Sequence, residues 1–188
     1  IDSKSIAALQ AKVGVLTAQQ RWADAEATVK KVLEMPEHRA LGHTLYGGLY
    51  FAQGRYEDAA VAYEDAYRLA PTAVEPITGV TMSYLAQEAP DKAAEFLETI
   101  IEKDSKNAVA HNLLGETRLR QNEPQEAEHH FRLAMASGGN WAVPTHNLAR
   151  LLAAHGEIHE VIAIYRAALE KQPGNVALQL ALAEAQQK

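Results

Sequence analysis

Apolar and small residues recur along the chain at a fixed spacing of 34 residues. The pattern is clearest in Tyr56, Ala59, Tyr63, Ala66 and Pro71. It returns three times in the same register, as Pro90, Ala93, Leu97, Ile100 and Ser105, as Pro124, Ala127, Phe131, Ala134 and Gly139, and as Ile158, Val161, Tyr165, Ala168 and Pro173. A period of this length is typical of stacked helical hairpins, because no single hairpin can bury its apolar face alone.

Within each period, two stretches of helical apolar spacing are separated by a break that contains Gly or Pro. Gly54 and Gly156 both occupy position 15 of their units, which suits a helix end that needs a left-handed residue. Pro90 and Pro124 occupy position 17, where the first turn of a second helix tolerates proline. The sequence therefore predicts a single array over residues 1–188, made of five repeats and one extra helix: 6–39, 40–73, 74–107, 108–141, 142–175 and 176–188.

Side-chain size predicts how the two helices of a hairpin pack. Positions 8 and 20 of the units are mostly small, whereas position 24 carries larger side chains. Small residues let helices approach closely, and larger ones fill the space beside them. The predicted fold is all-α, with antiparallel helix hairpins stacked in sequence order. The larger residues are Val29, Tyr63, Leu97, Phe131 and Tyr165.

These residues resemble the tetratricopeptide repeat family over residues 6–188. The second unit carries the family pattern most fully, with Gly47, Tyr50, Gly54, Tyr56, Ala59, Tyr63, Ala66 and Pro71. The sequence departs from the pattern at Lys12, Glu37, His43, His111, Arg118 and Gly139. The resemblance implies a right-handed superhelical solenoid whose first helices line a concave groove, with positions 2, 5, 9, 12 and 13 facing a bound partner.

The groove positions implied by the resemblance differ between the two halves of the chain. Phe51, Met82 and Leu85 would give the first half an apolar interaction patch, unless neighbouring helices cover them. Arg120, His146 and Arg150 could pair with a peptide carboxylate, or they could pair internally with Glu116. The candidate binding residues are Gln10, Thr44, Phe51, Thr78, Met82, Leu85, Asn112, Glu116, Arg120, His146 and Arg150.

Composition and charge narrow the function further. The chain is 47% hydrophobic and 22% charged, as expected of a folded domain. Its net charge of −6 and lack of a basic strip argue against nucleic acid as a partner. Without cysteine, a metal-binding helical motif or a nucleophile with its base, we expect no metal, no cofactor and no catalysis. No apolar run is long enough for membrane insertion.

The sequence therefore predicts a non-catalytic scaffold that binds a peptide or protein segment in its groove. Two alternatives stay open: a structural array that self-associates, and an accessory domain of a bacterial envelope, exopolysaccharide or secretion assembly. Self-association would use the terminal helices, through Leu178, Leu180 and Leu182 and through Ile6, Leu9 and Val13. The composition resembles long bacterial repeat proteins, of which this chain would be a piece. The expected location is soluble, in the cytoplasm or the periplasm, and the sequence does not separate the two.

Overall fold

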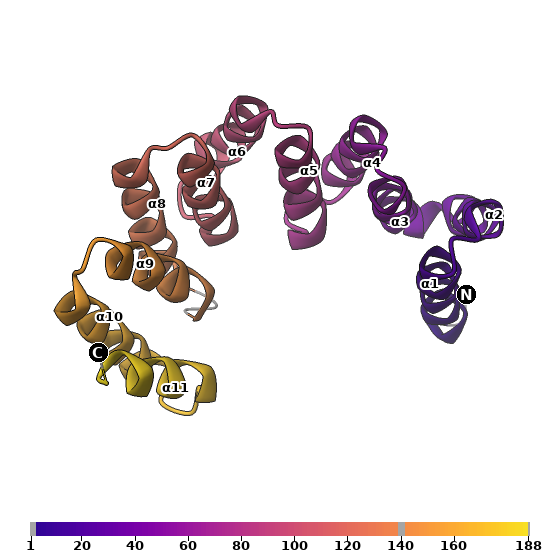
Figure 1. The fold of residues 1–188 in the computed structure, drawn as a ribbon. Helices are drawn as coiled ribbons and strands as arrows, with labels where there is room; N and C mark the ends of the chain where they lie inside the picture. The colour runs from indigo at the N-terminus through magenta and orange to yellow at the C-terminus, as the bar shows by residue number, and fades with distance from the viewer. Residues whose placement is uncertain (1–2, 139–141, 188) are drawn as a thin grey trace. The chain divides into compact units, whose positions relative to one another are not determined.

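The computed structural model describes residues 3–138 and 142–187, and all the regular structure in these residues is helical (Figure 1). Gly139, at which the sequence departs from the family pattern, and the unit boundary at residue 141 lie outside the described residues. In chain order the elements are α1 (Ser3–Ala18), α2 (Trp22–Leu33), the short 3-10 turn η1 (Pro36–His38), α3 (Arg39–Ala52), α4 (Tyr56–Leu69), α5 (Val74–Ala86), α6 (Pro90–Lys103), α7 (Ala108–Arg120), α8 (Pro124–Ala136), α9 (Ala142–Ala154), α10 (Ile158–Lys171) and α11 (Val176–Ala185).

The helix ends follow local sequence chemistry. Gly54 and Gly156 have φ values of 75° and 80°, just after α3 and α9 end, and this left-handed backbone is easiest for glycine. Pro90 and Pro124 are the first residues of α6 and α8, where a missing N–H has no helical partner to lose. The Asn107 side chain caps α7 by accepting a hydrogen bond of 3.0 Å from the Ala110 N–H.

The chain divides into two compact units, residues 1–93 and 94–188. In the first unit each helix packs against the next, from α1 through α5. In the second unit the same is true from α7 through α11, so helices that follow one another in sequence also pair in space. This confirms the all-α fold with consecutive packing of helix hairpins, typical of a repeat solenoid. A single array over residues 1–188 stays a prediction.

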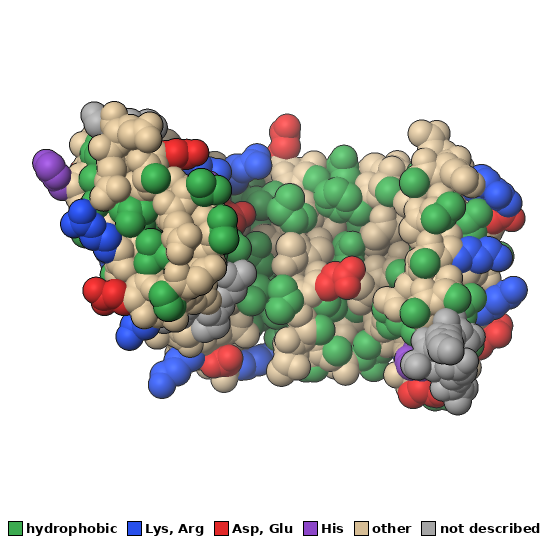
Figure 2. All heavy atoms as spheres, turned by 90° about the horizontal axis from the view of Figure 1, so that it is seen from below, with side chains coloured by type: hydrophobic (Ala, Val, Ile, Leu, Met, Phe, Trp, Pro, Cys, Tyr) green, Lys and Arg blue, Asp and Glu red, His purple; other side chains and the backbone are tan. Residues whose placement is uncertain are grey.

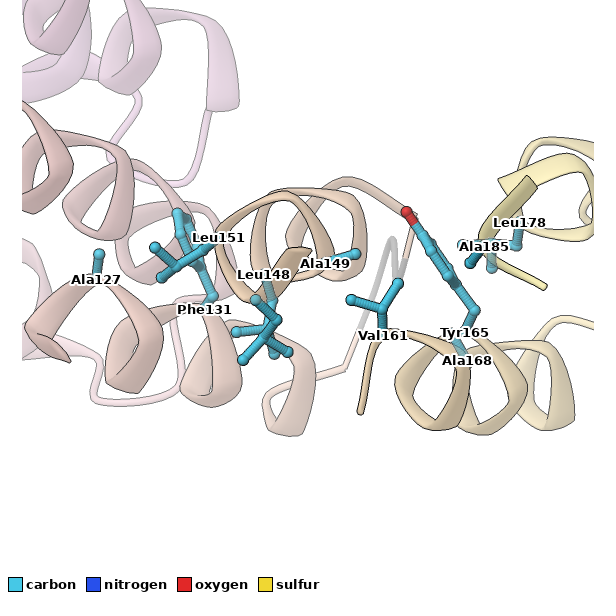
Figure 3. Packing of buried hydrophobic residues seen from close by; sticks show 11 residues of the cluster. Ala127, Phe131, Leu148, Ala149, Leu151, Val161, Tyr165, Ala168, Leu178 and Ala185 are labelled. Atoms are coloured by element: carbon cyan, nitrogen blue, oxygen red, sulfur yellow. The ribbon is translucent and has the colours of Figure 1, made fainter. Parts of the chain in front are cut away.

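The core of each unit lies between the paired helices. The small residues at position 20 and the larger ones at position 24, predicted to fill the space beside the close contact of the two helices, are all buried. In the second unit, Tyr165 of α10 stands between Ala149 of α9 and the residues Leu178 and Ala185 of α11, with its hydroxyl at the edge of the cluster (Figure 3). The position-24 side chain therefore joins three successive helices.

Three glycines allow the large position-24 rings to lie against the neighbouring helices. A Cβ added at Gly47 would lie 2.7 Å from the ring of Tyr63, and one added at Gly79 would lie 2.5 Å from the same ring. A Cβ added at Gly115 would lie 2.5 Å from the ring of Phe131. Such distances are well below van der Waals contact, so the helix backbones themselves form the surface on which these rings pack.

The glycine contact predicts a loss of stability for Gly115→Ala. Alanine gains about 1 kcal/mol of helix propensity, but overpacking against the fully buried Phe131 costs about 1–3 kcal/mol. We expect a net destabilisation of about 1 kcal/mol, measured by urea unfolding followed by circular dichroism.

Gly14→Ala is the matched control. Gly14 lies inside α1 and has no neighbouring atom within 4 Å of an added Cβ, so this variant should be up to about 1 kcal/mol more stable. If both substitutions stabilise the protein, the Phe131 ring does not constrain the backbone as argued.

Candidate functional site

An open groove in the first unit is lined by residues of α3, α4 and α5. Its volume is about 450 Å³, and its lining is mostly apolar. Phe51 comes from the last turn of α3, where its ring lies 5.1 Å from that of Tyr56. The whole lining consists of Phe51, Tyr63, Val74, Glu75, Thr78, Gly79 and Met82.

The groove brings together three of the residues predicted from the sequence, Phe51, Thr78 and Met82. Neighbouring helices cover Phe51 partly, whereas Met82 remains 41% exposed. On the face shown in Figure 2, hydrophobic side chains are interspersed with polar ones. The first unit therefore offers a local apolar groove of limited width.

Three other predicted residues of the first unit do not line this groove. Gln10 is exposed on α1, and Leu85 is half-buried on α5. Thr44 is buried, and its hydroxyl donates a hydrogen bond of 3.0 Å to the Ala40 carbonyl one turn earlier.

Sequence reasoning missed four residues of the lining: Tyr63, Val74, Glu75 and Gly79. Glu75 occupies position 2 of its unit, one of the positions expected to face a partner, so the repeat register alone could have identified it. Tyr63 was interpreted as core, which is correct for its ring.

Polar residues of α7 and α9 form a hydrogen-bonded network in the second unit. The Asn112 amide donates to Glu116 Oε1 at 2.9 Å. The Asn147 amide donates to the same oxygen at 2.8 Å and to Asn112 Oδ1 at 3.0 Å. Asn147 was not predicted, although Asn112 and Glu116 were. The network ties successive hairpins together and satisfies the buried Asn112 and the half-buried Glu116 and Asn147, which would be costly without partners.

Because Glu116 belongs to this network, it does not pair with the predicted basic residues. Glu116 bonds to the two asparagine amides, and the ion pairs among the described residues do not include Arg120 or Arg150. Both arginines are exposed. The alternative that Arg120 pairs internally with Glu116 is therefore wrong for this structure, and both guanidinium groups face solvent.

His146 and Arg150 line a smaller hollow of about 160 Å³ between α9, α10 and α11. His146 Nδ1 lies 3.3 Å from the Tyr165 hydroxyl. Glu184 of α11 lines the same hollow and brings an acidic group near Arg150. This space is smaller than the roughly 300 Å³ at which ligand pockets usually begin.

Family models of helical repeats match most of the chain. Tetratricopeptide repeat models match residues 15–74, 84–144 and 142–185. The chain belongs to the tetratricopeptide repeat family. No curated protein matches it in sequence.

Solved tetratricopeptide repeat structures share the fold at low sequence identity. TTC0263, a thermophilic protein from Thermus thermophilus, has a TM-score of 0.67 and 18% identity, with 96% of this chain and 98% of that one covered. Pseudomonas aeruginosa pilF has a TM-score of 0.58 and 20% identity, with coverage of 94% and 81%. YrrB, described as having an unusual peptide-binding site, has a TM-score of 0.54 and 18% identity, with coverage of 90% and 87%. Identities this low show a common fold.

The described residues contain neither a helix suited to spanning a membrane nor a cluster of side chains suited to binding a metal. None of their helices combines the length and the apolar character of a membrane span. No three of their histidine and carboxylate side chains cluster in an arrangement suited to a metal ion. A fold of this family typically serves as an interaction module without catalysis.

A pair of histidines joins the two helices of the fourth repeat. His111 Nδ1 of α7 lies 3.1 Å from His130 Nδ1 of α8, and His111 Nε2 lies 3.2 Å from the Ser105 carbonyl oxygen. Since a carbonyl only accepts, His111 carries its proton on Nε2, and His130 donates from Nδ1. Both rings are neutral in this arrangement, and they stack with centroids 5.4 Å apart.

Burial and neighbouring charges keep this pair neutral. Desolvation lowers the pKa of His130 to about 4, helped by the nearby His111, His129 and Arg118 and opposed by Glu126. Desolvation also lowers the pKa of His111, against the hydrogen bond to Ser105 and the charge of Asp104. A proton added at His111 Nδ1 would place two N–H groups face to face.

The histidine pair predicts that the folded protein loses stability in mild acid. Because the pKa of His130 is lower when folded than the usual 6.5, the unfolded chain binds more protons between pH 6.5 and 4, and stability falls as the pH falls through that window. We expect a loss of about 1 kcal/mol from His130 alone between pH 7 and 5.5. Urea unfolding at both pH values measures it.

A His111→Gln, His130→Gln double variant should lose most of this pH dependence. His159→Gln, at an exposed position of α10, is the control and should keep it. Equal pH dependence in the double variant and the wild type would contradict the assignment.

Proposed function

We propose that the chain is a non-catalytic scaffold that binds a peptide or protein segment, and that the groove lined by Phe51, Thr78 and Met82 is its main contact site. The observation that carries this proposal is the exposure of bulky apolar side chains in a concave surface. Exposed apolar clusters of this kind mark interaction sites on soluble proteins. Methionine and aromatic side chains are also the residues that adapt best to a partner.

The groove has the size and composition of a side-chain binding site. Its volume of about 450 Å³ lies within the roughly 300–1,000 Å³ common for ligand sites. A peptide-binding site is described for YrrB, and the shared fold supports the same class of partner here.

The second unit supports a contact of different chemistry. Arg120 and Arg150 present guanidinium groups to solvent outside the ion pairs of the described residues. We propose that these arginines, with His146, meet acidic groups of the partner. The Asn112, Glu116 and Asn147 network keeps α7 and α9 in place for that contact. A role as accessory domain of a larger bacterial assembly stays an alternative.

The groove proposal predicts that Met82→Glu removes partner binding without unfolding the protein. Met82 is exposed, so a carboxylate there costs little stability but introduces a charge into the apolar contact. The chain is immobilised and exposed to an extract of its own organism, and the retained proteins are measured by quantitative mass spectrometry. We expect their amount to fall at least tenfold for Met82→Glu.

Val61→Glu is the control for this experiment. Val61 is an apolar residue of α4 that is more exposed than Met82, at 59% against 41%, and does not line the groove. Retention that is equal for both variants would place the binding surface elsewhere.

Self-association is a second candidate function, and a feature of α11 favours it. Val176 and Leu180 are more than 60% exposed on this helix. Leu178, by contrast, is only 2% exposed and lies in the core of the second unit. The expected contact through Leu178 is therefore wrong, and a second copy would meet Leu180 and Val176 instead.

This surface predicts weak, concentration-dependent association that Leu180→Glu abolishes. A charge at the centre of an apolar contact opposes its burial. Sedimentation velocity over a hundredfold range of concentration measures it, and Leu69→Glu, at another exposed leucine, is the control. A wild-type protein that sediments as a monomer throughout would exclude this candidate.

A further inference from the structure

Tyr63 lines the apolar groove of the first unit, and its hydroxyl has no hydrogen-bond partner among the described residues. The Tyr63 side chain is only 9% exposed, and its ring is held between Gly47 of α3 and Gly79 of α5. An added Cβ at Gly48 would lie 3.5 Å from the hydroxyl, so the missing side chain leaves room around it. The fully buried side-chain atoms that lack a partner in the described residues do not include this hydroxyl, so it is accessible to a bound molecule.

Other repeats show that packing does not require this hydroxyl. Phe131 occupies the same position 24 in the fourth unit, lies against Gly115, and is completely buried. Tyr165 occupies it in the fifth unit, where His146 stands 3.3 Å from the hydroxyl. Tyr63 therefore differs from both: it has the hydroxyl that Phe131 lacks and misses the partner that Tyr165 has.

The missing partner can be traced to one position. His146 is residue 5 of its unit, and the equivalent residue in the second unit is Thr44. Thr44 directs its hydroxyl to the Ala40 carbonyl of its own helix, at 3.0 Å. The Tyr63 hydroxyl is consequently left for a bound molecule.

Glu75 adds a charge to the same groove. It is an exposed residue of the first turn of α5, and the ion pairs among the described residues do not include it. Burial, with a further contribution from Glu75, raises the pKa of Tyr63. The phenol therefore keeps its proton at neutral pH and is available as a donor.

We propose that this groove recognises an extended peptide in which a bulky apolar residue is followed or preceded closely by lysine or arginine. The apolar side chain contacts Phe51 and Met82, a backbone carbonyl of the peptide accepts a hydrogen bond from Tyr63, and the basic side chain pairs with Glu75. An extended segment fits because its carbonyls are free, whereas those inside a helix are already bonded. The inference rests on the proposed function of peptide binding and specifies its ligand.

Selection from a phage-displayed library of random 12-residue peptides tests the inference. We expect the peptides retained by the wild-type chain to share a large apolar residue with lysine or arginine within two positions. The best of these, synthesised with a fluorescent label, is then titrated against variants by fluorescence polarisation.

Two substitutions each remove one proposed contact. Tyr63→Phe keeps the ring between its glycines and should weaken binding about three- to tenfold, the effect of one hydrogen bond. Glu75→Gln should weaken it up to about fivefold at low salt, with a smaller effect at high salt. Tyr165→Phe and Glu57→Gln, at a tyrosine and an exposed first-turn acid outside the groove, are the matched controls and should leave affinity unchanged. Melting curves check that each variant folds.

The outcomes separate this inference from the proposed function. If Met82→Glu abolishes peptide binding, the groove remains a binding site. The inference is nevertheless overturned if those peptides lack a basic residue, or if they bind Tyr63→Phe and Glu75→Gln as tightly as wild type. A selection that enriches only acidic peptides dependent on Arg120 and Arg150 would overturn it too, and would leave the contact proposed for the second unit in place. If no enriched peptide depends on Met82, the inference and the proposed groove both fail.

Discussion

The contact between a large ring and a glycine backbone sets how closely successive helices can approach. Tyr63 fills the space between α3 and α5 because Gly47 and Gly79 have no side chains to occupy it. Phe131 uses Gly115 in the same way in the fourth repeat. Since protein interiors leave little free volume, the spacing of the helices follows from this pair of residue types.

The residue that makes this contact can also differ in polarity from one repeat to the next. The side chain at position 24 fills the space between helices, and in Tyr63 and Tyr165 it also lines a hollow at the surface. A hydroxyl there can be absent, as in Phe131, or bonded to a neighbour, as in Tyr165, or left open, as in Tyr63. Differences between repeats at this atom therefore change binding chemistry without changing the fold.

Sequence predicted the fold well because the repeat presents each structural requirement several times. Glycine at a left-handed helix end, proline in a first turn and small residues opposite large ones each reappear in register, so the helix boundaries follow almost directly. The candidate site was predicted less well. Side chains at one repeat position face different neighbours, and only coordinates show that Thr44 bonds to its own helix while His146 reaches a tyrosine.

The two units handle polar groups differently, and this favours the first as the site of specific recognition. In the second unit, Glu116 and the amides of Asn112 and Asn147 satisfy one another, and Tyr165 has His146 nearby. A partner that bonded to these groups would have to replace existing bonds, so much of the gain would be offset, and the exposed Arg120 and Arg150 are the groups left for a partner there. In the first unit the Tyr63 hydroxyl and the Glu75 carboxylate have no such bonds among the described residues. A ligand can satisfy them without breaking protein contacts, and a segment that lacks matching groups would leave the phenol buried and unpaired. That cost is the physical basis on which this groove would distinguish one apolar segment from another.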